Sequence, residues 1–226
     1  MQPRHFHSTI LLMTCLTGCA LLPTEPTTRH VLFVGNSYTF QHDVPALFRD
    51  ASGSDIRYET EMVAGPGLNL MAYVAYDRVE QLVATKDWYA IVLQDRSTAA
   101  FYEKDRSEFK LALEWFRAIA DEEGAQLFLF QTWPRRAGHS FYEAKAEPGF
   151  SPPRTPSEMS DRLIATYAEG AALSGAIVAP VGDCWFQQED VEILYAEDGS
   201  HASAIGARLA ARVIANTIAG TDDPCA

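Results

Sequence analysis

Two short segments at opposite ends of the chain contain the residue types of a catalytic triad. Ser37 stands two residues after the apolar run 30–35, and Asp198 precedes His201 by three residues near the carboxyl end. A serine hydroxyl becomes a nucleophile when a neighbouring base takes its proton, and histidine suits that task because its pKa lies near neutral pH. A carboxylate orients the imidazole and stabilises its charged form. These residues predict acyl transfer with Ser37 as nucleophile, His201 as base and Asp198 as orienting group.

The spacing of Asp198 and His201 has two interpretations. Residues three apart on a turn that leads into a helix can face the same side, so Asp198 could contact one ring nitrogen of His201 while the other points at Ser37. Alternatively, Asp198 only caps a helix that begins near His201. Each segment is a common pattern by itself. Their occurrence together, in the order Ser, Asp, His, favours the triad.

These motifs resemble the SGNH/GDSL hydrolase superfamily, most closely its branch with Gly-Asn-Ser-(Phe/Tyr)-Thr in the first block. Gly35-Asn36-Ser37-Tyr38-Thr39 carries that block, and Asp198 and His201 match the last one. The resemblance spans roughly residues 30–217. It implies an α/β fold: a three-layer α/β/α sandwich with a mostly parallel five-stranded sheet, as in flavodoxin-like SGNH hydrolases. It also implies Ser37 as the nucleophile of an esterase, with Asn36 beside it as a candidate substrate-binding residue.

The resemblance further implies donors for the oxyanion of a tetrahedral intermediate. Val63-Ala64-Gly65-Pro66-Gly67 resembles the second block, which makes the backbone N–H of Gly65 the first candidate and that of Gly67 the second, beside the N–H of Ser37. The third block departs from the superfamily pattern, because there is no Gly-x-Asn-Asp. The corresponding apolar run ends at Gln94, whose side-chain amide could replace the usual asparagine because both offer two N–H donors.

The elements that must position these residues follow from apolar runs of strand length that alternate with helix-length segments. This alternation predicts a parallel sheet covered on both faces, in an α/β three-layer sandwich. The predicted strands are 30–35, 57–63, 89–94, 126–132 and 176–181, and the clearest predicted helices are 107–122, 157–174 and 201–219. Ligands bind beyond the carboxyl ends of such strands. Because Ser37, Gly65 and Gln94 each follow an apolar run, we expect them at one edge.

Two loops near this edge carry further expectations. After Ser37, Asp43 and Pro45 suggest that the regular helix starts nearer Val44. The segment 133–156 is long and irregular, with arginines and aromatic residues that would suit a sugar-bearing or acidic substrate. Trp133, directly after a predicted strand, is its first candidate to line a pocket. The alternative is a solvated surface loop whose aromatic residues only pack it down.

The amino terminus reads as a targeting segment. Residues 1–18 have a positive start and a short apolar core, which is too short to span a membrane. Leu16-Thr17-Gly18-Cys19 resembles a bacterial lipobox, which predicts a lipid on Cys19, a tether over 19–29 and a hydrolase domain over 30–226. With alanine after Cys19, the expected location is the cell envelope, at the outer membrane of a Gram-negative bacterium. The alternative is an ordinary secretory signal in which Cys19 is incidental.

Charge and cysteine content limit the partners. Loss of residues 1–18 leaves 17 basic and 30 acidic residues, a net charge of −13. Such a surface repels nucleic acid, so we expect no nucleic-acid partner and a membrane contact only through the lipid on Cys19. Cys184 and Cys225 remain either as a disulfide, which an exported protein can form, or as two free thiols. No cysteine has metal-ligand spacing and the six histidines are scattered, so neither a metal nor another cofactor is expected.

The sequence therefore supports more than one function. The first is a serine esterase acting through an acyl-enzyme, with an acetylated carbohydrate or another small-molecule or glycan ester as substrate. The second is a glycan-binding lipoprotein with a degenerate hydrolase site, supported only by the incomplete third block. A glycosidase would need Glu61 and Asp95 within about 10 Å of each other. A nucleotide-binding site is excluded because the first glycine turn lacks Gly-x-Gly-x-x-Gly.

Overall fold

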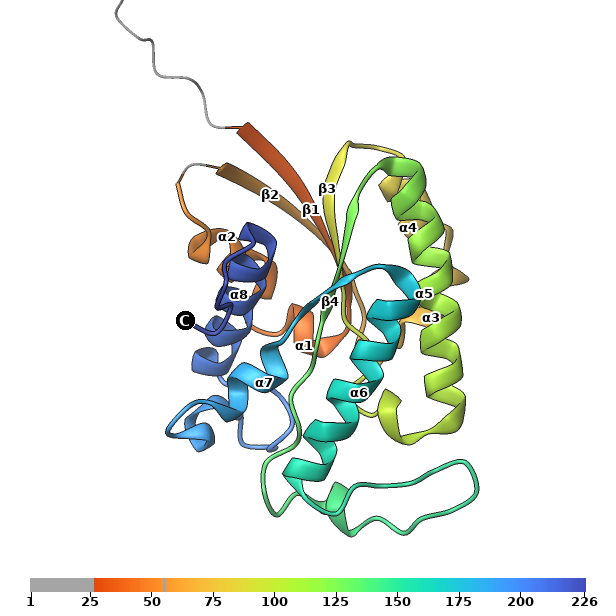
Figure 1. Ribbon diagram of the computed structural model, residues 1–226, viewed down its shortest axis with the longest axis vertical. Coiled ribbons are helices and arrows are strands. Elements are labelled where there is room, and N and C mark those ends of the chain that lie inside the picture. The colour runs from red at the N-terminus through yellow and green to blue at the C-terminus, as the bar shows by residue number, and fades with distance from the viewer. Residues whose placement is uncertain (1–26, 55) are drawn as a thin grey trace, which may run out of the picture.

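The protein folds around one five-stranded, all-parallel sheet with helices on both faces (Figure 1). The structure, a computed structural model, describes residues 27–54 and 56–226. The strands lie in the order β2-β1-β3-β4-β5. Their bounds are β1 Thr27–Gly35, β2 Ile56–Ala64, β3 Trp88–Leu93, β4 Gln126–Phe130 and β5 Ile177–Ala179. The predicted three-layer α/β/α sandwich is confirmed, and all five predicted strands are present.

The first strand is longer than predicted. Thr27, Thr28 and Arg29 pair in parallel with the first three residues of β2, so the folded domain begins at least three residues before the predicted boundary at residue 30. Thr27 and Thr28, which fall in the predicted tether, are β-branched, and such residues fit a strand well. The predicted signal at 1–18 and the lipid site at Cys19 lie outside the described residues.

The core has two halves because successive strand residues point to opposite faces of the sheet. On β1, Val31 and Phe33 face one half, while Leu32 and Val34 face the other, and all four are fully buried. Such continuous burial explains the uninterrupted apolar runs in the sequence. Helices α2 Val44–Ala51, α7 Val181–Phe186 and α8 Ala204–Ala219 cover the first face; α3 Leu70–Val74, α4 Asp77–Val83, α5 Glu103–Glu123 and α6 Pro156–Ser174 cover the second.

Short helical segments occupy several of the connections. These are α1 Ser37–Phe40, η1 Ala99–Phe101, η2 Ser140–Glu143 and η3 Val191–Leu194. Figure 1 shows α1 directly after β1, and the connection between β4 and α6 extending past the same end of the sheet. Among the residues that the structure covers, no helix is both long and apolar enough to cross a membrane.

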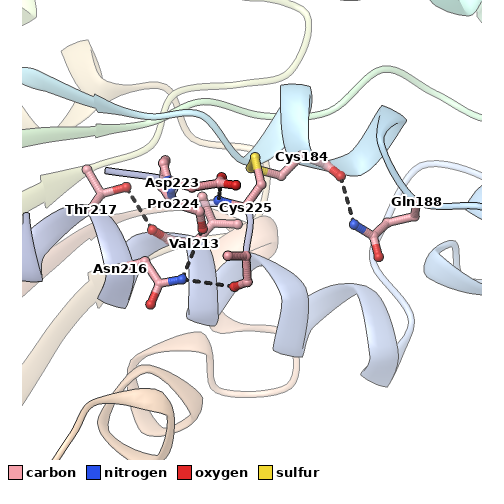
Figure 2. Close-up of a disulfide and its surroundings, with 9 residues drawn as sticks. Cys184, Gln188, Val213, Asn216, Thr217, Asp223, Pro224 and Cys225 are labelled. Carbon is pink, nitrogen blue, oxygen red and sulfur yellow. Dashed lines mark hydrogen bonds between the residues drawn. A yellow bond between two sulfur atoms is a disulfide. The ribbon is translucent and has the colours of Figure 1, made fainter. Parts of the chain in front are cut away.

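The carboxyl terminus is tied to α7 by a disulfide. Cys184 on α7 and Cys225 are bonded, with their Cα atoms 5.2 Å apart (Figure 2). The last residues fold back along α8, where the side-chain amide of Asn216 donates to the carbonyls of Pro224 and Ala226, each at 3.1 Å. This link matters for the site because α7 also carries Trp185, which packs behind the predicted triad.

Candidate active site

Ser37 lies at the start of a single helical turn beyond the carboxyl end of β1. The predicted start of the regular helix near Val44 is confirmed, because α2 begins there with Asp43 as its cap. A separate single turn that was not predicted, α1, begins earlier, at Ser37 itself. The side chain of Asn36 caps this turn, accepting from the backbone N–H of Tyr38 at 3.2 Å. As the first residue of the turn, Ser37 has a backbone N–H without a helical acceptor. That N–H can bind a negatively charged oxygen.

Ser37, His201 and Asp198 form a continuous hydrogen-bonded chain. The Nε2 atom of His201 is 2.9 Å from Oγ of Ser37, and its Nδ1 atom is 2.5 Å from Oδ2 of Asp198. The two segments are 164 residues apart in the sequence. The geometry is the one that a serine nucleophile, a general base and an orienting carboxylate require.

Hydrogen bonds within the turn 198–201 stabilise the ionised form of the Asp198 side chain. Its Oδ1 accepts from the backbone N–H groups of Ser200 and His201, each at 2.9 Å. Gly199, which lies between Asp198 and Ser200, has the positive φ of 64° that this turn requires. Burial alone would raise the pKa of Asp198, but the hydrogen bonds from His201 and from the two backbone N–H groups outweigh it and lower the pKa to about 2. Asp198 is therefore ionised at neutral pH. The alternative that it caps the last helix is wrong, since Ser203 caps α8.

A stack of aromatic side chains supports the imidazole ring of His201. The Tyr38 ring meets the His201 ring edge-on, with centroids 5.2 Å apart, and its hydroxyl lies 2.8 Å from Oγ of Ser200. Trp133 stacks on Tyr38 at 4.6 Å and on Trp185 at 4.2 Å. Trp133 is fully buried, and its indole N–H donates to the carbonyl of Ser200 at 3.0 Å. The expectation that Trp133 lines a pocket is therefore wrong: its large apolar rings lie in the core and support the site.

Gln94 does not face the site, which corrects its predicted role as an oxyanion donor. Its side chain is buried, and its Oε1 accepts from the backbone N–H of Asn36 at 3.0 Å and the hydroxyl of Thr39 at 2.8 Å. Its Nε2 donates to Oδ1 of Asn36 and to the carbonyl of Asp95. Both amide hydrogens are thus engaged, so Gln94 is a positioning residue for the turn that presents Ser37.

We expect Gln94→Ala to destabilise the fold rather than to remove one catalytic contact. The substitution leaves the buried backbone N–H of Asn36 and the Thr39 hydroxyl without partners, and each such group costs about 1–3 kcal/mol. The free energy of unfolding, measured with urea, should fall by at least about 2 kcal/mol. Gln131→Ala is the matched control, since Gln131 is equally buried but has an unpartnered Oε1. If the Gln94→Ala variant kept full stability but lost most of its turnover, the result would instead support Gln94 as an oxyanion donor.

The next residue, Asp95, also holds loops in place. It is buried, and its Oδ1 accepts from the backbone N–H groups of Leu70 at 3.1 Å and Arg96 at 2.7 Å. Burial raises the pKa of Asp95 to about 7 against these hydrogen bonds. Glu61 lies within β2 and forms an ion pair with Lys86. Because neither carboxylate lines the cavity at Ser37, the glycosidase alternative has no support.

Within the second block, Gly67 is a better candidate oxyanion donor than Gly65. The backbone N–H of Gly65 continues the sheet by donating to the carbonyl of Gly35 at 3.3 Å. The Leu68 side chain fills the space beside Gly65, because a Cβ atom added at Gly65 would lie 2.7 Å from Cδ1 of Leu68. Gly67 lines the cavity at Ser37, whereas Gly65 does not. The backbone N–H groups of Ser37 and Gly67 are thus the candidates.

An open cavity of about 310 Å³ surrounds the triad. Besides the three triad residues and Gly67, it is lined by Asn36, Tyr38, Arg96, Ser97, Thr98, Arg135, His139 and Ser200. Sequence reasoning placed Asn36 here and missed the roles of the others, although Arg135 and His139 belong to the irregular segment that it singled out. A larger hollow of about 450 Å³ between α2 and α8 contains none of the predicted site residues. In the described part of the chain, no group of three His, Cys, Asp or Glu side chains is arranged for a metal.

Comparison by sequence and by structure gave different results. No family model and no curated protein matches the chain. A solved protein of Slackia heliotrinireducens, assigned to the SGNH hydrolases, has 27% sequence identity and a TM-score of 0.72, over 85% of this chain and 100% of that one. A lipase/acylhydrolase from Enterococcus faecalis has 16% identity and a TM-score of 0.60, over 87% and 98%. A variant of an acetyl-xylooligosaccharide esterase from Geobacillus has 13% identity and a TM-score of 0.59, over 86% and 95%.

These structural neighbours are SGNH and GDSL-type hydrolases, and the chain has their fold. The likenesses at 16% and 13% identity concern the fold alone, and a fold hosts many activities. The chemistry of this chain must therefore be argued from its own residues.

Proposed function

We propose that this protein is a serine ester hydrolase that works through an acyl-enzyme. One observation carries the proposal: Ser37, His201 and Asp198 form a chain of two hydrogen bonds, 2.9 and 2.5 Å long, beside an open cavity. A serine that serves only in structure needs no imidazole on its hydroxyl and no carboxylate behind that imidazole.

The geometry supports a two-step reaction. Oγ of Ser37 attacks the ester carbonyl while Nε2 of His201 takes its proton, and Asp198 stabilises the imidazolium. The backbone N–H groups of Ser37 and Gly67 bind the oxyanion of the tetrahedral intermediate. His201 returns the proton to the leaving alcohol, and the acyl group stays on Ser37. Water, activated by His201, then attacks the acyl-enzyme, and carboxylate and free Ser37 are released.

The proposed substrate is a small acyl ester, such as an acetylated carbohydrate. The cavity is open and is lined by hydroxyl, guanidinium and imidazole groups, which suits a hydroxyl-rich alcohol and a short acyl chain. A neighbour of similar fold is an acetyl-xylooligosaccharide esterase, which supports the substrate class by analogy. Asn36 lines the cavity, although its side chain also holds the turn by donating to the carbonyl of Leu68 at 3.0 Å.

The test is an assay of the purified domain on p-nitrophenyl acetate, p-nitrophenyl octanoate and acetylated xylo-oligosaccharides. We expect turnover of the acetates and slower turnover of the octanoate, with a rapid first release of p-nitrophenol if deacylation limits the rate. A protein that binds the oligosaccharides but cleaves no ester would be the glycan-binding lipoprotein instead.

We also propose that a lipid on Cys19 anchors the domain in the cell envelope, at the outer membrane of a Gram-negative host. The support is the lipobox-like run that ends at Cys19. Cys19→Ala should move the protein from the membrane fraction to the soluble fraction, with its specific esterase activity unchanged. Retention of that variant in the membrane fraction would contradict lipid anchoring.

A further inference from the structure

Arg135 brings a positive charge into the cavity without a carboxylate to balance it. Its Nη1 donates to Oγ of Ser200 at 2.5 Å and lies 3.3 Å from Nε2 of His139, and its guanidinium lies over the Phe141 ring at 5.2 Å. Its Nε is buried and has no hydrogen-bond partner. Within the described residues, Nη2 makes no hydrogen bond and no carboxylate forms an ion pair with Arg135.

The other charged groups of the cavity already have partners of their own. Arg96 forms an ion pair with Asp105 at 2.9 Å, and the Asp198 carboxylate accepts its hydrogen bonds from His201 and from two backbone N–H groups, not from Arg135. Burial, and then the charge of Arg135, lower the pKa of His139, so this imidazole is neutral at neutral pH. Arg135 is therefore the cation of the cavity that has no carboxylate partner among the described residues.

This arrangement is unusual for a chain with 30 acidic and 18 basic residues. A partly buried arginine is normally paired, because removing its charge from water costs free energy that a carboxylate recovers. Guanidinium groups also match carboxylates geometrically, through two parallel N–H donors. A guanidinium left open beside Ser37 in an acidic protein suits an anionic group that arrives with the substrate.

We propose that the substrate carries a carboxylate and that Arg135 binds it. The preferred substrate is then a sugar acid that is acylated on a hydroxyl and keeps its carboxylate free, rather than an acylated neutral sugar. The proposal rests on the proposed esterase function and narrows its substrate class. Arg135 positions the substrate's alcohol part, while Ser37, His201 and Asp198 act on the acyl group.

The test compares two esters that differ only in one group, which is a charged carboxylate in the first and a neutral hydroxymethyl group in the second. One is an O-acetylated methyl galacturonide, and the other is the methyl galactoside acetylated at the same hydroxyl. The measured quantity is the ratio of their kcat/KM values, because any effect on the triad common to both esters cancels. We expect the wild type to favour the galacturonide by about tenfold to a hundredfold, the range of a charge-assisted hydrogen bond. Arg135→Gln should bring the ratio close to one, and Arg135→Lys should retain part of the preference.

Arg136→Gln is the matched control. It removes the same charge from the adjacent residue, which forms an ion pair with Glu192 at 3.9 Å and does not line the triad cavity. This variant should keep the wild-type ratio. A wild-type ratio at or below one, or an equal fall in the Arg136→Gln variant, would overturn the proposal.

Binding to the inactive Ser37→Ala variant separates this inference from the esterase function. By calorimetry, free galacturonate should bind more tightly than galactose, and Arg135→Gln in the same background should abolish that difference. If no ester is hydrolysed but this binding difference appears, the esterase function fails and the anion site stands. If esters are hydrolysed without preference and the two sugars bind equally, the anion site fails and the esterase function stands.

Discussion

Ser37→Ala is expected to reduce ester turnover by at least about ten-thousandfold while leaving the fold intact. The reason is that Oγ of Ser37 is the atom proposed to form the acyl-enzyme, and loss of a triad nucleophile removes most of the rate enhancement. The substitution deletes a single oxygen from a partly exposed side chain, so the melting temperature should stay close to that of the wild type. Initial rates on p-nitrophenyl acetate and a thermal melt together check both expectations.

Ser97→Ala provides a comparison within the same cavity. Ser97 lines the cavity, but among the described residues it forms no hydrogen bond with His201, whose Nε2 pairs with Ser37. This variant should therefore keep far more turnover than Ser37→Ala. Undiminished hydrolysis by the Ser37→Ala variant would show that a different group carries the reaction.

Asp198→Asn is expected to lower kcat by about a hundredfold to ten-thousandfold without unfolding the protein. The carboxamide oxygen can still accept from the N–H groups of Ser200 and His201, which preserves the turn. Its NH2 group, however, would face Nδ1 of His201 and favour the tautomer with its proton on Nε2, where it cannot accept the proton of Ser37. The side chain of Asp198 is 50% exposed, so the loss can be smaller than for a fully buried carboxylate.

The pH dependence sharpens this prediction. Since the pKa of Asp198 is about 2, the wild-type carboxylate is present throughout the range from pH 5 to pH 9. The deficit of the Asp198→Asn variant should therefore appear over the whole range in a kcat profile. Near-wild-type turnover across that range would mean that Asp198 only holds its turn together and that the orienting group lies elsewhere.

The sheet and the positions of Ser37, Asp198 and His201 could be predicted because each has a local signal. A strand buried on both faces reads as an unbroken apolar run, and the ends of such runs mark one edge of a parallel sheet. The three residues of the triad occur in two short motifs at suitable positions in the chain. Helix boundaries have weaker local signals: α8 starts at Ala204 rather than at residue 201, and Ile205 in its first turn is apolar but 52% exposed.

The remaining parts of the site depend on side-chain directions that a linear pattern does not contain. Gln94 occupies the expected place at the end of β3, but its amide turns inward because Asn36 and Thr39 offer partners there. Trp133 follows β4 as expected, yet it stacks between Tyr38 and Trp185, which lie far away in the sequence. These contacts between distant segments decide which of the residues at the edge face the cavity and which support it.

The most direct test of the central claim is covalent labelling of the nucleophile. The wild-type domain is incubated with an alkyl fluorophosphonate, which reacts with activated serines, and the modified peptide is identified by mass spectrometry. We predict one equivalent of phosphonyl group on Ser37, loss of esterase activity in proportion to labelling, and no labelling in the Ser37→Ala or His201→Ala variants. Labelling of another residue with parallel loss of activity, or full activity after complete modification of Ser37, would contradict a serine hydrolase that uses Ser37.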